Sequence, residues 1–292
     1  MHSYVYKKID AFTSKNSLGN PAACLYLSAE ETLSEEQMQR IAAQHKGFVS
    51  EVVYCFEARG EYTLYYYSSE CEVNFCGHGT IACMHSLIKQ TPTLLSQSAF
   101  TVNTHKKGPL TVYNRLCNED AVYIAAPQPV FIGTKLVKRD AAQALGLAED
   151  RLSEAYPLDL IDAGLRTLIV PILTLSDEIS VYPHESKLKT FCEDIDADIL
   201  LIYSMQAQGT GFHAHTRVFA PRFGYLEDPA TGSGNSAFGH YMLKHGLWDG
   251  SAIAVEQGGD NRAFNTVKLQ MSNGQLLFGG SATLRIDGHY II

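Results

Sequence analysis

The hydrophobic pattern of this 292-residue chain consists mostly of short segments with period two, interrupted by a few stretches with period three to four. Period two is typical of half-buried strands, and the longer period is typical of amphipathic helices. Apart from two helices treated below, the predicted helices are residues 33–45, with Ser34 as the candidate cap, 140–145 and 185–195. The predicted strands are residues 5–12, 22–27, 50–56, 62–67, 98–102, 110–113, 121–125, 168–173, 199–204, 213–219, 252–256, 266–271, 275–279 and 282–286.

One Gly-rich passage between a strand and an apolar helix occurs twice, 155 residues apart (227 − 72 = 155). Its turns read Cys76-Gly-His-Gly79 and Thr231-Gly-Ser-Gly234, and the helical stretches that follow are residues 81–88 and 237–243. A Gly-x-Gly turn that opens a helix brings backbone N–H groups and the positive end of the helix dipole to one place. Two such turns facing each other would hold an anion, which indicates chemistry on a small acid.

The element pattern restarts near Cys117, so the chain is predicted to form two similar α+β halves, residues 1–116 and 117–292. Short strands at this spacing suit a barrel, and helix faces rich in Ala and Gly suit a helix packed inside one. Each half is therefore expected to be a curled, mostly antiparallel sheet or barrel around one central helix. The terminal strands are free to cross back to the first half.

The composition of the chain argues against several classes of binding partner. The net charge is −8 and no basic run exceeds residues 105–107, which argues against a nucleic-acid groove or an anionic membrane surface. The apolar run at residues 168–173 is far too short to cross a bilayer. Seven cysteines, an odd number without a paired framework, together with no signal-like N-terminal segment, favour a reduced cytoplasmic protein.

Glu51 stands at the head of an otherwise apolar strand and shares a face with Val53 and Cys55. A carboxylate in apolar surroundings can carry protons near neutrality, which makes Glu51 the candidate general acid/base. The alternative is a strand-end glutamate that reaches solvent or a backbone amide.

The two turns carry further candidates. Cys76 lies at a helix N-terminus, which favours its thiolate, although an inert packing role is at least as plausible. His78 between two glycines is expected to face a ligand. Asp228 either binds or protonates a substrate, or serves only the Asp-Pro-x-Thr-Gly bend.

Neither a metal nor an organic cofactor is expected. The cysteines and histidines near the first turn lack the close pair spacing of a zinc site; they are Cys71, Cys76, His78, Cys83 and His85. The second turn, residues 232–235, lacks the lysine of a P-loop and the spacing of a dinucleotide fingerprint, which argues against ATP and NAD.

At residues 19–22 (Gly-Asn-Pro-Ala), 50–51, 76–80 and 227–233, the chain resembles the phenazine-biosynthesis PhzF-like family of the diaminopimelate epimerase-like fold. The resemblance extends over essentially the whole chain. It implies two pseudo-symmetric halves with the active site between them, and no metal or cofactor. In the phenazine enzyme a glutamate after serine moves a proton between carbons of a dihydroxy-anthranilate-type substrate.

The resemblance assigns that glutamate to Glu51, and it assigns substrate binding to the two turns: Gly77, His78, Asp228, Gly232 and Ser233. Cys76 joins these binding candidates because the epimerases of this fold keep a catalytic cysteine there. Thr231 replaces their second cysteine, which excludes racemisation by two thiols and leaves isomerisation by a single base. Gly79 stands where Ala is more usual, and Arg262 is a further candidate contact.

The sequence thus predicts an isomerase that acts on a small carboxylate, with Glu51 as acid/base and with assembly into a homodimer left open. A non-catalytic carboxylate binder on the same scaffold is the alternative. A cysteine hydrolase using Cys76 and His78 is a third class, disfavoured because side chains two residues apart at a turn are expected to diverge. Gly232→Val is expected to abolish binding while costing the fold less than a core cavity would, unless the glycines only permit helix packing against the sheet.

Overall fold

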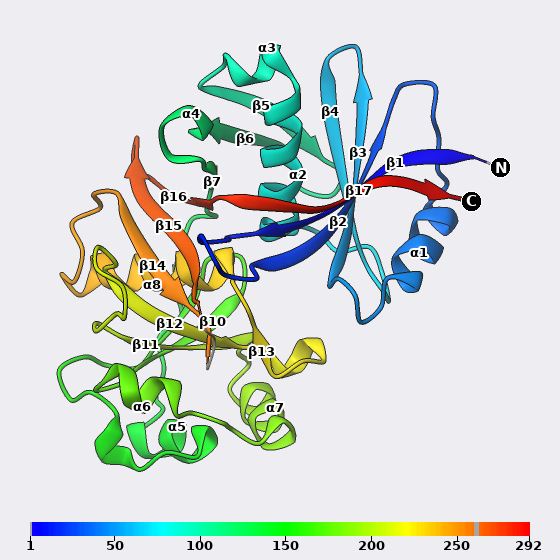
Figure 1. Ribbon diagram of the computed structural model, residues 1–292. Helices are drawn as coiled ribbons and strands as arrows, with labels where there is room; N and C mark the ends of the chain where they lie inside the picture. The colour runs from blue at the N-terminus through cyan, green and yellow to red at the C-terminus, as the bar shows by residue number, and fades with distance from the viewer. Residues whose placement is uncertain (1, 260–262) are drawn as a thin grey trace. The chain divides into compact units, whose positions relative to one another are not determined.

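The computed structural model describes residues 2–259 and 263–292, so Arg262 lies outside the described part of the chain. The chain forms two compact units, Met1–Ala125 with Gly279–Ile292, and Ala126–Phe278 (Figure 1). The expected boundary after residue 116 falls inside the first unit, because strand β7 (Val122–Ala125) pairs with β6 (Gly108–Asn114). The C-terminal strand β17 belongs to the first unit as well, since it pairs with β1 along nearly its whole length.

The first unit is a curled, mostly antiparallel sheet in the order β17-β1-β2-β3-β4-β5-β6-β7. Its remaining strands are β1 (Ser3–Ala11), β2 (Asn20–Leu27), β3 (Glu51–Ala58), β4 (Glu61–Ser68), β5 (Ala99–Thr104) and β17 (Ala282–Ile291). Its helices are α1 (Glu35–Gln44), α2 (Gly77–Gln90), α3 (Pro92–Leu95) and α4 (Leu116–Glu119).

Helix α2 is the centre of this unit. It packs against β1, β2 and β3 and also against β17 and β7, which are the two ends of the sheet order. Nearly all of its residues from Gly79 to Ile88 are buried, as expected for a helix enclosed on all sides. The sheet therefore curls around α2, which confirms the predicted architecture.

Helix α1 packs on the outside of the sheet against β3 and β4. The predicted cap is confirmed: the Ser34 hydroxyl accepts from the Gln37 amide at 3.2 Å, and the Gln37 side chain accepts from the Ser34 amide at 2.9 Å. This reciprocal pair satisfies two N–H groups that the first turn leaves without partners.

The second unit contains the strands β8 (Val130–Phe131), β9 (Asp159–Asp162), β10 (Arg166–Pro171), β11 (Ile199–Ser204), β12 (Ala214–Phe219), β13 (Glu227–Asp228), β14 (Ile253–Gln257) and β15 (Asn265–Ser272), and most of β16 (Gln275–Gly280). Its helices are α5 (Lys138–Leu145), α6 (Leu175–Ile179), α7 (Glu185–Asp194) and α8 (Gly232–Lys244), with short 3₁₀ turns η1 (Glu149–Arg151) and η2 (Pro221–Phe223).

Alternate residues of β11 serve the two faces of this second sheet. Leu200 and Ile202 belong to a core cluster shared with residues of α5 and α7. Tyr203 points the other way and packs on Phe238 of α8, with 4.6 Å between the ring centroids. Both faces are covered, so this strand is apolar at every position except its last.

The two units repeat one order of strand pairings. From β1 to β6 the successive pairs are antiparallel, parallel, antiparallel, parallel and antiparallel. From β9 through β10, β11, β12 and β14 to β15 the same five kinds of pairing recur in the same order. The predicted pseudo-symmetric halves are therefore confirmed at the level of topology.

None of the helices in residues 2–259 and 263–292 is both long and apolar enough to cross a membrane.

Candidate functional site

Three side chains of the first unit converge at the N-terminus of α2. The Glu51 Oε2 atom lies 3.3 Å from Nε2 of His78, and the Cys76 Sγ atom lies 3.5 Å from Nδ1 of the same ring. One ligand-type atom from each residue lies within 4.8 Å of the other two. The expectation that Cys76 and His78 diverge is therefore wrong, because the first helical turn folds both side chains to one side.

Local backbone geometry explains the position of Cys76. Cys76 is the N-cap of α2, in an extended conformation, and its sulfur accepts from the Gly79 amide at 3.3 Å. A Cβ on Gly79 would stand 2.7 Å from a methyl carbon of Val53 and 2.9 Å from the Cys76 sulfur. Only glycine allows α2 to approach β3 this closely, so Gly79 brings the thiol next to the start of β3.

Glu51 is the first residue of β3, opposite Ala22 on one side and Ser68 on the other. Its side chain is 20 % exposed, yet its Oε2 atom is buried and has no hydrogen-bond partner among the described residues. The hydroxyl of Ser50 lies 3.5 Å from Nε2 of His78, so the Ser50-Glu51 pair approaches the imidazole from one edge.

The second turn, in the second unit, is a closed hydrogen-bonded loop. The Thr231 hydroxyl donates to the Asp228 carboxylate. The Gln257 side chain donates to the Asp228 carbonyl at 2.9 Å and accepts from the Thr231 amide at 2.9 Å and from Asn235 at 2.7 Å. Asp228 is thus held by its own turn, and Ser233, half-buried in the first turn of α8, is the more accessible candidate.

The two turns have nearly the same backbone and different chemistry. Cys76 and Thr231 cap their helices at φ −135°, ψ 107° and φ −121°, ψ 108°. The Cys76 sulfur accepts from its helix, whereas the Thr231 side chain makes no cap bond. The strand that takes the place of β3 in the second unit, β11, begins with the buried apolar residue Ile199, so only the first unit has an acid at this point.

Packing is a second reason for glycine at position 232, beside the binding role that the sequence predicts. A Cβ at this position would stand 2.2 Å from Cε2 of Phe278. Its φ is not in the left-handed region. The glycine is required by packing against an aromatic ring, so the cost of Gly232→Val to the fold is larger than the sequence predicts. The glycine Gly234, two residues later, is less constrained, with its nearest contact at 3.3 Å.

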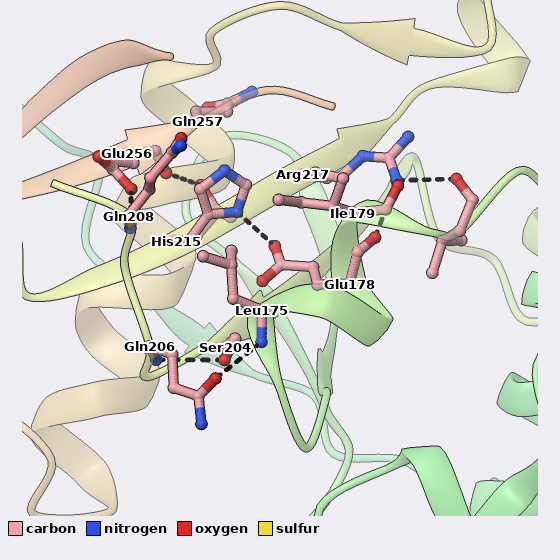
Figure 2. A network of polar contacts seen from close by, with 12 residues as sticks. Leu175, Glu178, Ile179, Ser204, Gln206, Gln208, His215, Arg217, Glu256 and Gln257 are labelled. Carbon is pink, nitrogen blue, oxygen red and sulfur yellow. Dashed lines mark hydrogen bonds and ion pairs between the residues drawn. The ribbon is translucent and has the colours of Figure 1, made fainter. Parts of the chain in front are cut away.

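A buried polar network supports the strand that leads to the second turn. Arg217, only 1 % exposed, donates through Nη1 to the carbonyls of Glu178, Ile179 and Val181 at the end of α6 (Figure 2). Its Nε and Nη2 atoms hold the Glu227 carboxylate at 3.0 and 2.9 Å. Arg217 therefore anchors the residue immediately before Asp228.

Figure 2 also shows a buried acid–imidazole pair beside Arg217: Oε1 of Glu178 lies 3.0 Å from Nδ1 of His215, and neither side chain is exposed. Burial raises the pKa of Glu178 well above its usual range. Burial, helped by the Arg217 charge, lowers the pKa of His215 to about 3. The pair is therefore held in a net neutral form.

The sequence did not reveal the residues that hold the candidate side chains in place. Ser50 was recognised only as the residue before Glu51, and Gln257 was given no role. Nothing in the spacing of Arg217 and Glu227 indicated that they pair. The side-chain amide of Gln257, with two donors and two lone pairs, is the one feature that could have indicated a residue able to tie a turn together.

The chain is similar to known proteins over nearly its full length. A family model described as "Phenazine biosynthesis-like protein" matches residues 9–288. The "Uncharacterized isomerase YfhB" of Bacillus subtilis is 26% identical over 96% of this chain and 94% of its own length. The trans-2,3-dihydro-3-hydroxyanthranilate isomerase of Pseudomonas chlororaphis is 25% identical over 96% of this chain and 98% of its own length.

Solved structures of other proteins have a similar fold. The crystal structure of a Bacillus anthracis phenazine biosynthesis protein of the PhzF family superposes with a TM-score of 0.83 and 26% identity, covering all of both chains. A probable proline racemase from Agrobacterium radiobacter has a similar fold, with a TM-score of 0.63 at 10% identity.

Proposed function

We propose that this chain, which belongs to the phenazine biosynthesis-like family of isomerases, moves a proton between two carbons of a small carboxylate-bearing metabolite with Glu51 as general acid/base. The carboxylate of Glu51 takes a proton from one carbon and donates a proton to another carbon of the same molecule. Its side chain is 20 % exposed, so the carboxyl proton exchanges with solvent between the two steps. No cofactor is needed for this step, because one proton is lost at the first carbon and one is gained at the second.

The observation that carries the proposal is the buried Oε2 atom of Glu51, which meets His78 only in a 3.3 Å ion-pair contact. This atom has no hydrogen-bond partner among residues 2–259 and 263–292. Buried carboxylate oxygens in proteins are nearly always bonded. The carboxylates of Glu227 and Glu256 follow that rule, since both accept two hydrogen bonds. An oxygen without such a bond is available to accept a proton from a substrate.

Substrate binding is assigned to the two helix N-termini. The N–H groups that follow Gly77 and Gly232 point out of the first turns of α2 and α8, where an anion is stabilised. His78 and Ser233 add side-chain donors, Cys76 adds a thiol, and Asp228 is proposed to bind a polar group of the substrate. The substrate is proposed to be cyclic or an aromatic precursor, by analogy with the hydroxyanthranilate isomerase relative.

A single base suits isomerisation. Racemisation by two opposed thiols requires a cysteine in both turns, and Thr231 occupies the second position. The difference between Cys76 and Thr231 thus supports a transfer by one base, in which Glu51 both accepts and donates a proton. The repeated order of strand pairings and the matched cap geometry support an internal duplication in which only the first copy kept the acid.

Exchange of solvent deuterium into a substrate is the direct test. The purified protein is incubated in D₂O with a panel of small cyclic and aromatic carboxylates, and carbon-bound deuterium is measured by NMR. A ligand that binds without acquiring deuterium would favour the non-catalytic binder. Glu51→Gln is expected to lower the exchange rate roughly 10²–10⁴-fold.

Glu57→Gln is the matched control, because Glu57 lies on the same strand and its carboxylate accepts from the nearby Gly60 amide. It is expected to retain the parent rate. Full exchange by a folded Glu51→Gln variant would contradict the proposed role.

Acyl transfer by a cysteine is the second candidate function, and the convergence of Cys76, His78 and Glu51 favours it. The sulfur lies 3.5 Å from one nitrogen of the ring and the carboxylate 3.3 Å from the other. The nucleophile Cys76, the base His78 and the orienting acid Glu51 thus contact one another in that order. Stoichiometric acylation of Cys76 by an activated ester, seen by mass spectrometry and absent in Cys76→Ser, would support it.

A further inference from the structure

We propose that Glu51, Cys76 and His78 form a site for a thiophilic divalent metal ion, of which Zn²⁺ is the representative, and that the ion inhibits the enzyme. Carboxylate oxygen, thiolate sulfur and imidazole nitrogen are the three ligand types that Zn²⁺ accepts in proteins. No other group of three such side chains lies this close together within the described residues. The inhibitory part rests on the proposed role of Glu51, whereas the binding part does not.

The distances fit tetrahedral coordination. Bonds of about 2.0–2.3 Å to a tetrahedral Zn²⁺ place neighbouring ligand atoms roughly 3.3–3.6 Å apart. The Glu51 Oε2 and His78 Nε2 atoms are 3.3 Å apart, and Nε2 lies 3.8 Å from the Cys76 sulfur. Small side-chain rotations thus suffice to bring all three atoms onto one ion, with water as the fourth ligand.

Two of the three ligands can be anionic, and together they offset the positive end of the α2 dipole when a cation is bound. The Gly79 amide already donates to the Cys76 sulfur, which stabilises the deprotonated form that a metal requires. The Glu51 oxygen without a hydrogen-bond partner supplies a second negative ligand. Binding releases the proton of the thiol to solvent, so affinity is expected to fall as the pH is lowered.

Sequence spacing could not reveal this set. Zinc was discounted from the cysteines and histidines near the first turn, none of which forms a close pair. The third ligand is Glu51, which comes from a different strand. The site holds both the acid/base and the neighbouring thiol, so an ion there would remove the group that carries the proton.

Binding is tested by titrating the full chain with Co²⁺ and recording the near-ultraviolet charge-transfer band that a thiolate–Co²⁺ bond produces, followed by displacement with Zn²⁺. One equivalent of Co²⁺ is expected to bind. Cys76→Ser is expected to abolish the band and Glu51→Gln to weaken binding by roughly 10–100-fold or more. Circular dichroism verifies that both variants fold. Mg²⁺, which prefers oxygen ligands, is expected not to compete.

The matched controls remove an exposed thiol instead: Cys71→Ser and Cys117→Ser should leave the band unchanged. Absence of the band in the parent, or its persistence in Cys76→Ser, would overturn the site.

Inhibition is then tested by the deuterium exchange assay. Zn²⁺ should stop exchange and EDTA should restore it. Exchange that depends on Glu51 but is insensitive to saturating Zn²⁺ would refute the inhibitory role alone. A positive Co²⁺ spectrum together with no exchange in any substrate would refute the isomerase proposal and leave the metal site standing.

Discussion

Gly232 lies directly beneath the ring of Phe278, so closely that a Cβ on residue 232 would be 2.2 Å from ring atom Cε2. Aromatic carbons cannot move that far without displacing the strand that carries them. We therefore expect Gly232→Ala to lower the free energy of unfolding by about 1–3 kcal/mol through overpacking. Urea denaturation followed by circular dichroism measures this.

Two other glycines calibrate that measurement. Gly234→Ala places its Cβ at 3.3 Å from its nearest neighbour and should cost less, and Gly288→Ala meets nothing within 4 Å. The double variant Gly232→Ala with Phe278→Leu should regain part of the loss. If the first variant is as stable as the parent, the packing explanation of this glycine is wrong.

Arg217→Met should strongly lower the free energy of unfolding. The arginine is 1 % exposed, and its loss leaves the Glu227 carboxylate and the carbonyls at the end of α6 without their donor. Breaking a buried pair from one side costs about 3–5 kcal/mol. A fall in the urea midpoint with an unchanged m-value would be the expected result.

Arg166→Met provides the contrast. Arg166 is 31% exposed and pairs with Asp198 at the protein surface, where such pairs contribute about 0–1 kcal/mol. If both substitutions lower the free energy of unfolding equally, the burial of Arg217 adds nothing to the strength of its interactions.

Local patterns predicted the fold and many of its elements, because strand period and cap chemistry depend on neighbours in sequence. Glu51 was assigned to the face of its strand that holds Val53, and the Ser34 cap was recognised from four adjacent residues. The contact between Gly79 and Val53, by contrast, depends on how α2 slides along β3. No local pattern records that register.

The same limit explains the wrong expectations. The cost of a side chain at Gly232 was underestimated because Phe278, whose ring such a side chain would meet, comes 46 residues later (278 − 232 = 46). Cys76 and His78 were expected to diverge because the helical turn that brings them together is set by packing of α2 inside its sheet. In both places the structure depends on contacts between segments that are distant in the sequence.

The buried Glu178–His215 pair should give stability a distinctive pH profile. In the folded chain the pair retains one proton, because burial raises the pKa of Glu178 and lowers the pKa of His215 to about 3. In the unfolded chain the two groups titrate near their ordinary values of about 4.3 and 6.5. Below about pH 4.3 the unfolded pair binds more protons than the folded pair, so its contribution to stability rises with pH from about 3 to 4.3.

Between about pH 4.3 and 6.5 both states hold one proton and the contribution is flat. Above about 6.5 the unfolded pair loses its last proton while Glu178 keeps the folded pair protonated, so stability falls as the pH rises, with a slope approaching 1.4 kcal/mol per unit. Urea midpoints measured upward from pH 6 should show this fall until Glu178 itself ionises in the folded chain, and Glu178→Gln should remove it. An identical slope in that variant would show that the pair does not hold the proton.

Gln257→Leu tests whether Gln257 positions the second turn for substrate or only stabilises the second unit. The Gln257 side chain bonds the Asp228 carbonyl, the Thr231 amide and the Asn235 side chain, and all of these groups are buried. Removing it leaves them unsatisfied, at a cost of about 1–3 kcal/mol for each. The turn should then loosen, and KM for an identified substrate should rise more than kcat falls, because Gln257 itself touches no reacting atom.

Asn114→Leu is the matched control, because it removes three side-chain hydrogen bonds, to the carbonyls of Leu94, Leu95 and Gln97, from strand β6 in the first unit. It should lower stability without changing KM. Steady-state kinetics at a temperature where both variants remain folded gives the comparison. An unchanged KM in Gln257→Leu, measured alongside a loss of stability, would show that Gln257 stabilises the second unit without positioning Asp228 or Ser233 for the substrate.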